Sequence, residues 1–337
     1  MVLLPQTTRA VDTCDVRTRA FGKTDLKVSE FGLGCARIGG IFQADSAGFL
    51  RLLQAARDAG INFFDTADMY AQGESELLLG RAFRGQRDRV ILASKAGYCL
   101  PTRRQFAARL KPLLRPALRL LKIRRERLSN AVRGSITQDF TPEHLRKAVE
   151  GSLRRLGTDY LDLLQLHSPP AEVVDRGQWE PVLEGLKRAG KIRYYGVSCD
   201  TLECGLAALR YPGISALQFP FSLLERRVAL AVLPAVRERG VAGIARECLA
   251  NGLLAKKAEE IDLATYGGSP EERAVREEQL AKYRRLAERE GRSLGGMALD
   301  FVTSTDGVAV TLVGARSQDQ LRAVLREASR GQATAAL

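Results

Sequence analysis

The strongest constraint on the fold of this chain is the alternation of short apolar runs with amphipathic segments. The runs that end at Asp65, Lys95 and His167 are almost continuously apolar, which is typical of strands buried on both faces of a parallel sheet. The segments between the runs have helical spacing and start signals. Thr141-Pro142-Glu143, for example, supplies a cap, a first-turn proline and an acidic residue. About eight strand–helix units follow one another, as a (β/α)8 barrel requires.

The expected elements can be placed by residue number. Strands are expected at 31–35, 61–65, 89–95, 160–167, 192–198, 214–219, 241–246 and 309–313. Helices are expected at about 46–59, 74–83, 141–156, 179–188, 201–209, 228–239, 271–290, 294–303 and 317–328. A short hairpin at 19–29 precedes the first barrel strand. We therefore expect one barrel domain over residues 18–330, with loose tails at 1–17 and 331–337.

The charge of the chain is concentrated in one segment. The formal net charge is +13 over 337 residues, and segment 100–136 alone carries eleven basic residues against one acidic residue. This basic insertion follows the third expected strand, so it should lie on the carboxyl-end rim of the barrel. It could be a lid, a contact for an acidic substrate or protein partner, a membrane-surface helix, or a solvated insertion. We favour a lid or a contact for a substrate or partner. Because the rest of the chain is nearly neutral, we expect no specific nucleic-acid binding.

Composition and cysteine spacing indicate the cellular compartment and bear on whether the protein binds a metal. No apolar run is long enough to span a bilayer, and the first residues lack the apolar core of a signal peptide. The six cysteines show neither CxxC pairing nor zinc-like spacing with the two histidines, and His144 is expected at the surface. We therefore expect a cytoplasmic protein with reduced thiols and no metal site.

Four residues supply candidate chemistry at the expected strand ends. Asp65, Lys95 and His167 each finish a strand, and Tyr70 lies in the loop that follows Asp65. In a parallel barrel, active sites are built at this carboxyl-end rim. A lone residue of any of these types at a strand end is usually a cap or a solvated group, but four together indicate a site. Lys95, oriented by Asp65, could lower the pKa of Tyr70, and His167 could bind a carbonyl oxygen, so the set suits proton delivery to a carbonyl. No covalent nucleophile next to a base is apparent. The reactant that is missing for such a reaction is a hydride, so a cofactor is needed.

The chain resembles the aldo-keto reductase superfamily over about residues 18–327. Three blocks carry the resemblance: Asp65-Thr66-Ala67 with Tyr70 and Gly73-Glu74-Ser75-Glu76; Ser152-Leu153 with Leu156-Gly157, Asp159-Tyr160, Asp162-Leu163 and His167; and Gly190-Lys191-Ile192-Arg193-Tyr194 with Gly196-Val197-Ser198. The resemblance implies a (β/α)8 barrel that reduces aldehydes or ketones with NADPH. It makes Tyr70 the general acid, Lys95 and Asp65 the residues that tune it, and His167 the residue that orients the carbonyl.

The resemblance also implies where the cofactor would bind. It assigns cofactor positions to Ser198, Cys199, Gln218, Arg246, Leu249, Gly252, Gly314, Arg316 and Gln320. Arg316 is the expected partner of the 2′-phosphate, which favours NADPH over NADH. The chain departs from the family at three positions: Cys199 and Val324 stand where the family commonly has asparagine, and Arg246 stands where it often has an aromatic residue.

The predicted function is therefore NADPH-dependent reduction of a small aldehyde, ketone or sugar-like carbonyl. The alternative is an NADPH-binding regulatory subunit with little turnover, which would dock on a partner through the basic insertion. The intact set of four residues favours the enzyme, while the departures at Cys199 and Arg246 keep the alternative open.

Overall fold

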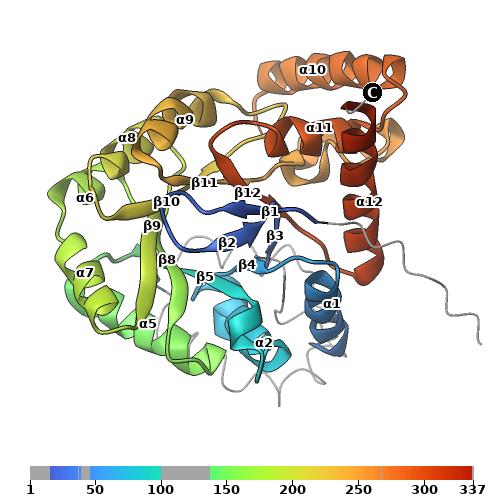
Figure 1. Ribbon diagram of the computed structural model, residues 1–337. Helices are drawn as coiled ribbons and strands as arrows, with labels where there is room; N and C mark the ends of the chain where they lie inside the picture. The colour runs from blue at the N-terminus through green and yellow to red at the C-terminus, as the bar shows by residue number, and fades with distance from the viewer. Residues whose placement is uncertain (1–15, 37, 39–45, 100–136, 267, 336–337) are drawn as a thin grey trace, which may run out of the picture.

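The computed structural model describes residues 16–335 apart from residues 37, 39–45, 100–136 and 267. Eight strands among the described residues form a closed parallel barrel in the order β10-β11-β12-β3-β4-β5-β8-β9 (Figure 1). Their bounds are β3 Phe31–Gly34, β4 Phe63–Asp65, β5 Ile91–Ala96, β8 Leu161–His167, β9 Ile192–Ser198, β10 Ile214–Pro220, β11 Ala242–Arg246 and β12 Val308–Val313. The predicted (β/α)8 fold is confirmed, with element ends shifted by a few residues.

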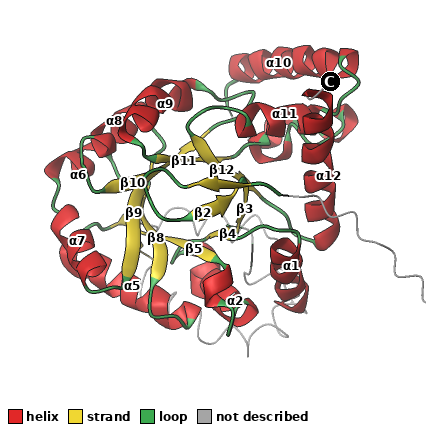
Figure 2. Ribbon diagram, viewed as in Figure 1, coloured by secondary structure: helices red, strands yellow, loops and turns green. Residues whose placement is uncertain are grey.

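Helices surround the barrel (Figure 2). Their bounds are α1 Ser46–Asp58, α2 Glu74–Ala82, α5 Pro142–Leu156, α6 Ala171–Arg176, α7 Glu180–Arg188, α8 Leu202–Leu209, α9 Arg227–Arg239, α10 Pro270–Arg289, α11 Leu294–Thr303 and α12 Gln318–Ala335. The short α6 was not predicted, and α12 continues past the boundary expected at residue 330. None of the helices in the described parts of the chain is both long and apolar enough to cross a membrane.

The core is divided into two layers by the strands. One cluster fills the barrel interior and includes Phe63, Leu163 and Ile244. A larger cluster packs between the strands and the helices, where Trp179 is 1% exposed and donates its indole N–H to the carbonyl of Val174. Because successive residues of a strand point to opposite faces, strands such as β4 and β8 contribute to both layers. This explains why the strands have nearly continuous apolar runs.

The predicted amino-terminal hairpin is present and closes one end of the barrel. Strands β1 (Thr18–Ala20) and β2 (Lys27–Ser29) pair antiparallel. Phe21, between them, is fully buried and its ring lies 5.8 Å from that of Phe63. The turn approaches the start of β11, where the Lys23 N–H donates to the Gly240 carbonyl. The hairpin therefore covers the amino ends of the strands and leaves the carboxyl ends for a site.

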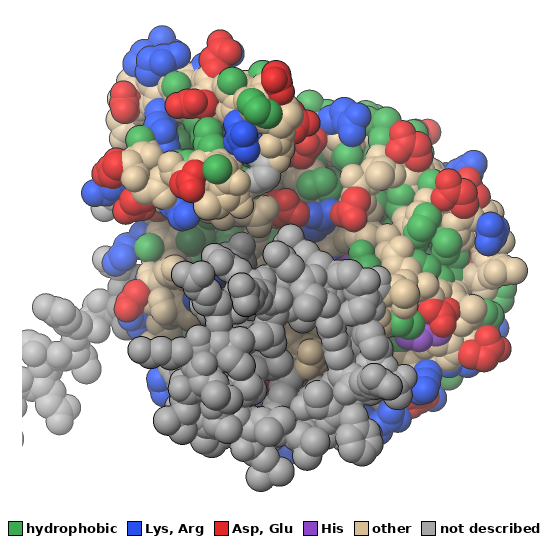
Figure 3. All heavy atoms as spheres, turned by 180° about the vertical axis from the view of Figure 1, so that it is seen from behind, with side chains coloured by type: hydrophobic (Ala, Val, Ile, Leu, Met, Phe, Trp, Pro, Cys, Tyr) green, Lys and Arg blue, Asp and Glu red, His purple; other side chains and the backbone are tan. Residues whose placement is uncertain are grey.

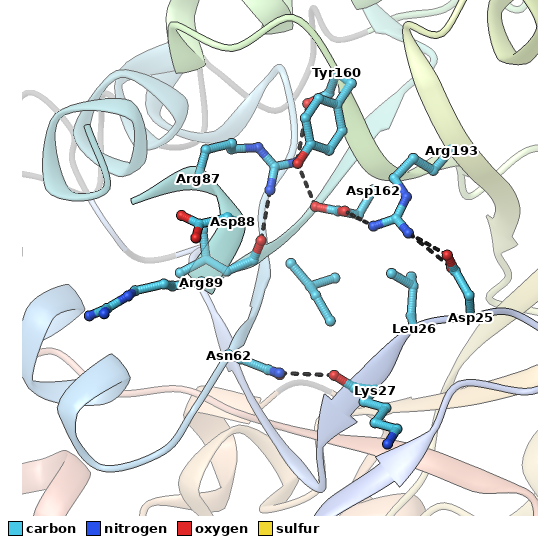
Figure 4. Close-up of a pocket in the computed structure, with 12 residues that line it drawn as sticks. Asp25, Leu26, Lys27, Asn62, Arg87, Asp88, Arg89, Tyr160, Asp162 and Arg193 are labelled. Carbon is cyan, nitrogen blue, oxygen red and sulfur yellow. Dashed lines mark hydrogen bonds and ion pairs between the residues drawn. The ribbon is translucent and has the colours of Figure 1, made fainter. Parts of the chain in front are cut away.

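A polar cleft of about 210 Å³ lies beside the hairpin (Figure 4). The buried carboxylate of Asp162 accepts from Arg87 at 2.5 Å and from Arg193 at 2.9 Å, and Arg193 also pairs with Asp25. Arg87 further donates to the carbonyls of Val90 and Tyr160. The volume is below that of an ordinary small-molecule site, and these two guanidiniums are already paired. The cleft is therefore a structural network at the end of the barrel opposite the predicted active site.

A second hairpin begins directly after β5. Strand β6 (Tyr98–Cys99) pairs antiparallel with β7 (Thr137–Gln138), and β7 leads into α5. Gly97, at the junction with β5, has a φ of 131°, and a Cβ there would lie 2.1 Å from the Phe140 ring. The basic insertion 100–136 connects the two strands and lies outside the described residues, so its predicted role remains a prediction.

Side chains of both charge signs are interspersed on the face opposite the amino-terminal hairpin. Figure 3 shows this face, on which the described part of the chain presents no continuous basic patch. Outside the basic insertion, the visible surface therefore agrees with the nearly neutral charge balance of the sequence.

Candidate active site

The four predicted catalytic residues meet at the carboxyl ends of neighbouring strands. Asp65 ends β4, Lys95 lies near the end of β5, and His167 ends β8. The three strands are consecutive in the barrel, with Asp65 paired in register with Ala93 and Lys95 with Gln165. Tyr70 begins a short 3-10 turn, Tyr70–Gly73, in the loop after β4. The structure therefore brings together the set that the sequence indicated.

Lys95 and Asp65 form a buried ion pair at the base of this site. Their side chains are 1% and 6% exposed, and the Lys95 Nζ to Asp65 Oδ2 distance is 2.6 Å. Lys95 also donates to the Thr66 carbonyl at 3.1 Å. Burial alone would lower the pKa of the lysine, but Asp65 and Tyr70 outweigh burial and raise that pKa above its usual value. Lys95 is therefore held as a charged ammonium.

Two glutamine amides complete the coordination of Asp65. Gln165 and Gln218 donate to Oδ1 from 3.2 Å and 3.1 Å. Gln165 was missed by the sequence analysis, although it lies two residues before His167 and so shares its face of β8. The carboxylate is thus bonded at both oxygens, which fixes its orientation toward Lys95.

Tyr70 lies above the ion pair. The Lys95 ammonium is 5.2 Å from the centroid of the Tyr70 ring. Burial raises the pKa of the phenol, Lys95 lowers it, and Asp65 raises it, with a net increase above the usual value near 10. The effect of Lys95 has the predicted direction but is smaller than the effect of burial. Tyr70 therefore carries its proton at neutral pH, as a proton donor must.

His167 is packed between two tyrosine rings. The Tyr70 ring meets the imidazole edge-on at a centroid distance of 5.7 Å, and the Tyr98 ring does so at 4.7 Å. Burial, assisted by the charges of Lys95 and Arg246, lowers the pKa of His167 well below its usual value. The imidazole is therefore neutral at neutral pH and can donate one hydrogen bond. Its Nδ1 is buried without a hydrogen-bond partner among the described residues.

Two further residues near this set were not found from the sequence. Tyr98 reaches His167 from the β6–β7 hairpin, whose pairing across the insertion has no local sequence signal. Asp68 lies in the Tyr70 loop, and burial, with the charge of Glu76 adding, raises the pKa of its carboxyl to about 7. One Asp68 oxygen has no hydrogen-bond partner in the described structure.

The predicted cofactor residues lie along the next four strands of the barrel. Ser198 ends β9, Gln218 lies in β10, Arg246 ends β11, and Gly314 follows β12. Since β9, β10, β11 and β12 are consecutive in the barrel, these residues form an arc on the same rim as the catalytic set. The Gln218 carbonyl oxygen Oε1 is buried and has no partner among the described residues, so it is available to a polar ligand.

Two of the departures from the family pattern occupy defined places. The Cys199 thiol is fully buried, donates to the Gln218 backbone carbonyl at 3.4 Å, and has its pKa raised by burial to about 12. Cys199 thus directs its side chain into the core between strand and helix. Arg246 pairs with Asp200 and Glu247, so its guanidinium is held at the rim with its charge matched by two carboxylates.

The remaining predicted cofactor positions lie in two loops and in the first turn of α12. Leu249 precedes the turn Ala250–Gly252, in which Ala250 and Asn251 have positive φ angles and Gly252 has a φ of 100°. A Cβ at Gly314 would meet nothing within 4 Å. Beyond it, the Gln320 side chain accepts from the backbone N–H of Arg316 at 2.8 Å. Val324, by contrast, packs against the core from α12. The backbone is therefore open at Gly314, whereas the N–H groups of Ala250, Gly252 and Arg316 already donate within the protein.

Comparisons with known proteins agree with this geometry. The family model described as "Aldo/keto reductase family" matches residues 30–334. The uncharacterized oxidoreductase YqkF of Bacillus subtilis is 30% identical over 317 residues, covering 93% of this chain and 92% of that protein. Pyridoxal 4-dehydrogenase of Microbacterium luteolum is 28% identical over 318 residues, with 90% of each chain covered.

A solved structure shows the same fold. The aldo-keto reductase AKR11C1 from Bacillus halodurans, in its holo form, superposes with a TM-score of 0.73 at 28% identity, covering 93% of this chain and 91% of that one. The family-model match, the near-complete coverage and the structural similarity lead to one conclusion. The chain belongs to the aldo/keto reductase family of oxidoreductases.

Proposed function

We propose that this protein is an NADPH-dependent reductase of a small aldehyde, ketone or sugar-like carbonyl, with Tyr70 as the general acid. The observation that carries the proposal is the buried Lys95–Asp65 ion pair beneath a protonated Tyr70 and beside a neutral His167. The groups that a carbonyl reduction needs from the protein, a proton donor and a hydrogen-bond donor, are both in place. The comparisons lend no support to the regulatory alternative.

Each of the four residues has a distinct role in this proposal. His167 donates a hydrogen bond to the carbonyl oxygen and so orients the substrate. Tyr70 donates its proton to the same oxygen as negative charge develops there. Lys95 stabilises the phenolate that remains, and Asp65 holds Lys95 in position. The buried ion pair thus favours release of the Tyr70 proton to the carbonyl oxygen as negative charge develops on that oxygen.

The residues on the rim fit a nicotinamide cofactor, which supplies a hydride when it is bound. The free Oε1 of Gln218, with Ser198 beside it on the next strand, suits the carboxamide end. The turn 249–252 is placed at the pyrophosphate by the family resemblance, and its Ala250 and Gly252 N–H groups already donate to the carbonyls of Glu247 and Leu249. Gly314, Arg316 and Gln320 suit the adenosine end. Arg246, which is already paired with two carboxylates, borders the nicotinamide position.

The geometry of the site allows both reduction of a carbonyl and oxidation of an alcohol. By microscopic reversibility the same site would support oxidation of an alcohol or a lactol, with NADP⁺ accepting the hydride and the Tyr70 phenolate taking up the hydroxyl proton. One relative is named pyridoxal 4-dehydrogenase, a name that denotes the oxidative direction for that protein. The substrate panel for this chain should therefore include both carbonyls and their alcohols.

The function is tested by cofactor titration followed by turnover assays. We expect quenching of protein fluorescence on addition of NADPH, and NADPH oxidation with at least one member of a panel of aldehydes, ketones and aldoses. Oxidation of the matching alcohol with NADP⁺ should run at the same site. Absence of NADPH binding would contradict the proposal, and binding without turnover on any substrate would favour the regulatory alternative.

A separate prediction concerns the preference for NADPH over NADH. We expect Arg316→Ala to weaken NADPH binding by roughly 10–100-fold, the effect of losing a charge-assisted hydrogen bond to phosphate. NADH affinity should stay nearly unchanged, because NADH lacks the 2′-phosphate. Equilibrium titration with both cofactors measures the ratio of the NADPH and NADH dissociation constants. The matched control is Arg322→Ala, on the exposed surface of α12. An equal loss for both cofactors would rule out a specific phosphate contact.

A further inference from the structure

Three potential metal ligands from separate parts of the chain meet beside the catalytic rim. Cys99 lies in β6, Asp139 follows β7, and His144 is in the first turn of α5. The Cys99 Sγ is 3.5 Å from His144 Nδ1, and this nitrogen is 3.9 Å from Asp139 Oδ2. One donor atom of each residue lies within 4.8 Å of the others. A soft thiol, an imidazole and a carboxylate around one point are the ligand types that zinc takes in proteins.

We propose that Cys99, Asp139 and His144 form a binding site for a zinc ion that ties the β6–β7 hairpin to α5. Tetrahedral zinc with bonds of about 2.0–2.3 Å places its ligand atoms roughly 3.4–3.6 Å apart. The Cys99–His144 separation already has this value, and the Asp139–His144 separation needs to close by only a few tenths of an ångström. The fourth position would be taken by water.

The local backbone holds the three donors in place. The Asp139 N–H donates to the Gly97 carbonyl at 2.8 Å, which keeps Asp139 beside Cys99 across the hairpin. Asp139 Oδ1 accepts from the Thr141 N–H at 2.8 Å, so Oδ2 is the oxygen that faces His144. Thr141 in turn caps α5 by accepting from the His144 N–H. The orientation of the carboxylate and of the histidine backbone is therefore fixed before any ion arrives.

Accessibility and charge also favour a cation at this point. The side chains of His144 and Asp139 are 20% and 38% exposed, and Cys99 is half-buried, so an ion can enter from solvent. The carboxylate of Asp139 lies within 4.8 Å of the Cys99 sulfur and supplies negative charge that a dication would offset.

The linear spacing of these three residues does not indicate a metal site. Cys99 and His144 are 45 positions apart, with the basic insertion between them, so they match no short zinc motif. The site also adjoins the proposed catalytic centre, since Tyr98, next to Cys99, stacks on His167. The zinc site is inferred from Cys99, Asp139 and His144 alone and is independent of the proposed function.

The test is zinc binding by the metal-free full-length protein, measured by competition with a chromophoric chelator. We expect one high-affinity zinc per chain. Loss of a residue that only supports a zinc ligand costs about 10–100-fold in zinc affinity. Cys99→Ser and His144→Gln each remove a ligand itself, so each should weaken zinc binding by about 100-fold or more. Asp139→Asn should weaken binding less, since an amide oxygen can still coordinate. Cys204→Ala, in the core of α8, and Cys14→Ser, outside the described residues, are controls that should leave binding unchanged.

Cobalt substitution gives a second readout that does not depend on stability. Co²⁺ bound by the wild-type protein should show sulfur-to-metal charge-transfer absorption, together with d–d bands of tetrahedral intensity. The charge-transfer band should vanish in Cys99→Ser, while circular dichroism confirms that the variant is folded. Absence of high-affinity zinc binding would overturn the proposal, as would zinc affinity and a cobalt spectrum that are the same in Cys99→Ser and His144→Gln as in the wild type.

Discussion

Replacing Tyr70 by Phe should lower kcat by about 10²–10⁴-fold or more, because it removes the only proton that the proposed mechanism gives to the carbonyl oxygen. The phenyl ring keeps its edge-on contact with His167 and its position near Lys95. Affinity for NADPH should therefore change little. Steady-state assays and NADPH titration of the same preparation separate the two effects, and unchanged turnover would refute the assignment of Tyr70.

Tyr98→Phe is the matched control for this substitution. Tyr98, like Tyr70, makes an edge-on contact with His167, so the same chemical change is made beside the same imidazole. The Tyr98 contact is made by its ring, which phenylalanine retains. We expect Tyr98→Phe to keep most of the turnover. The reverse result, with Tyr98→Phe inactive and Tyr70→Phe active, would move the general acid to the β6–β7 hairpin.

The pH profile of the wild type provides a second readout for Tyr70. Reduction needs the protonated phenol, so the rate should fall as pH rises through the pKa of Tyr70. Because burial raises that pKa above its usual value near 10, the rate of reduction should be level across neutral pH and fall only in strongly alkaline buffer. His167, whose pKa is lowered, stays neutral over the same range. A fall near neutral pH in wild type would mean that Lys95 dominates once ligands are bound.

The fold was predictable because its signals are local in the sequence. Strands such as β12, which is buried along its whole length, are nearly continuous apolar runs, and Thr141 and Pro142 mark the start of α5. Asp65, Lys95 and His167 could be grouped because consecutive strand–helix units place consecutive strands side by side. Family resemblance then supplied the cofactor positions, which the structure arranges on the adjacent strands of the same rim.

Features that depend on long-range contacts could not be predicted in the same way. Tyr98 reaches His167 only because β6 pairs with β7 across residues 100–136. The thiol of Cys199 turns into the core, which the residue type alone does not reveal. The direction in which the pKa of Tyr70 shifts depends on the balance between burial and the Lys95 ammonium. The burial of a side chain cannot be read from a linear sequence. The missing information is in each case three-dimensional packing.

Replacing Lys95 by Met should destabilise the protein by about 3–5 kcal/mol, the usual cost of leaving one charge of a buried pair uncompensated. Methionine has a similar length and no charge, so packing is nearly preserved while Asp65 loses its 2.6 Å partner. Gln165 and Gln218 still donate to Asp65 and offset part of the loss. Chemical denaturation measures the change in unfolding free energy, and turnover should be lost in parallel. Lys191→Met, which removes an exposed pair with Glu150, should cost only about 0–1 kcal/mol.

The double variant Asp65→Asn/Lys95→Met separates stability from catalysis. With both charges removed, the buried site is neutral, and the asparagine oxygen can still accept from Gln165 and Gln218. We expect most of the unfolding free energy to return, because neutral replacements of buried ion pairs are often nearly as stable as the pair. Turnover should stay low, since no ammonium remains to stabilise the Tyr70 phenolate. Recovery of both stability and turnover would show that the ion pair has a structural role only. Recovery of neither would show that the neutral pair does not restore the packing of the site.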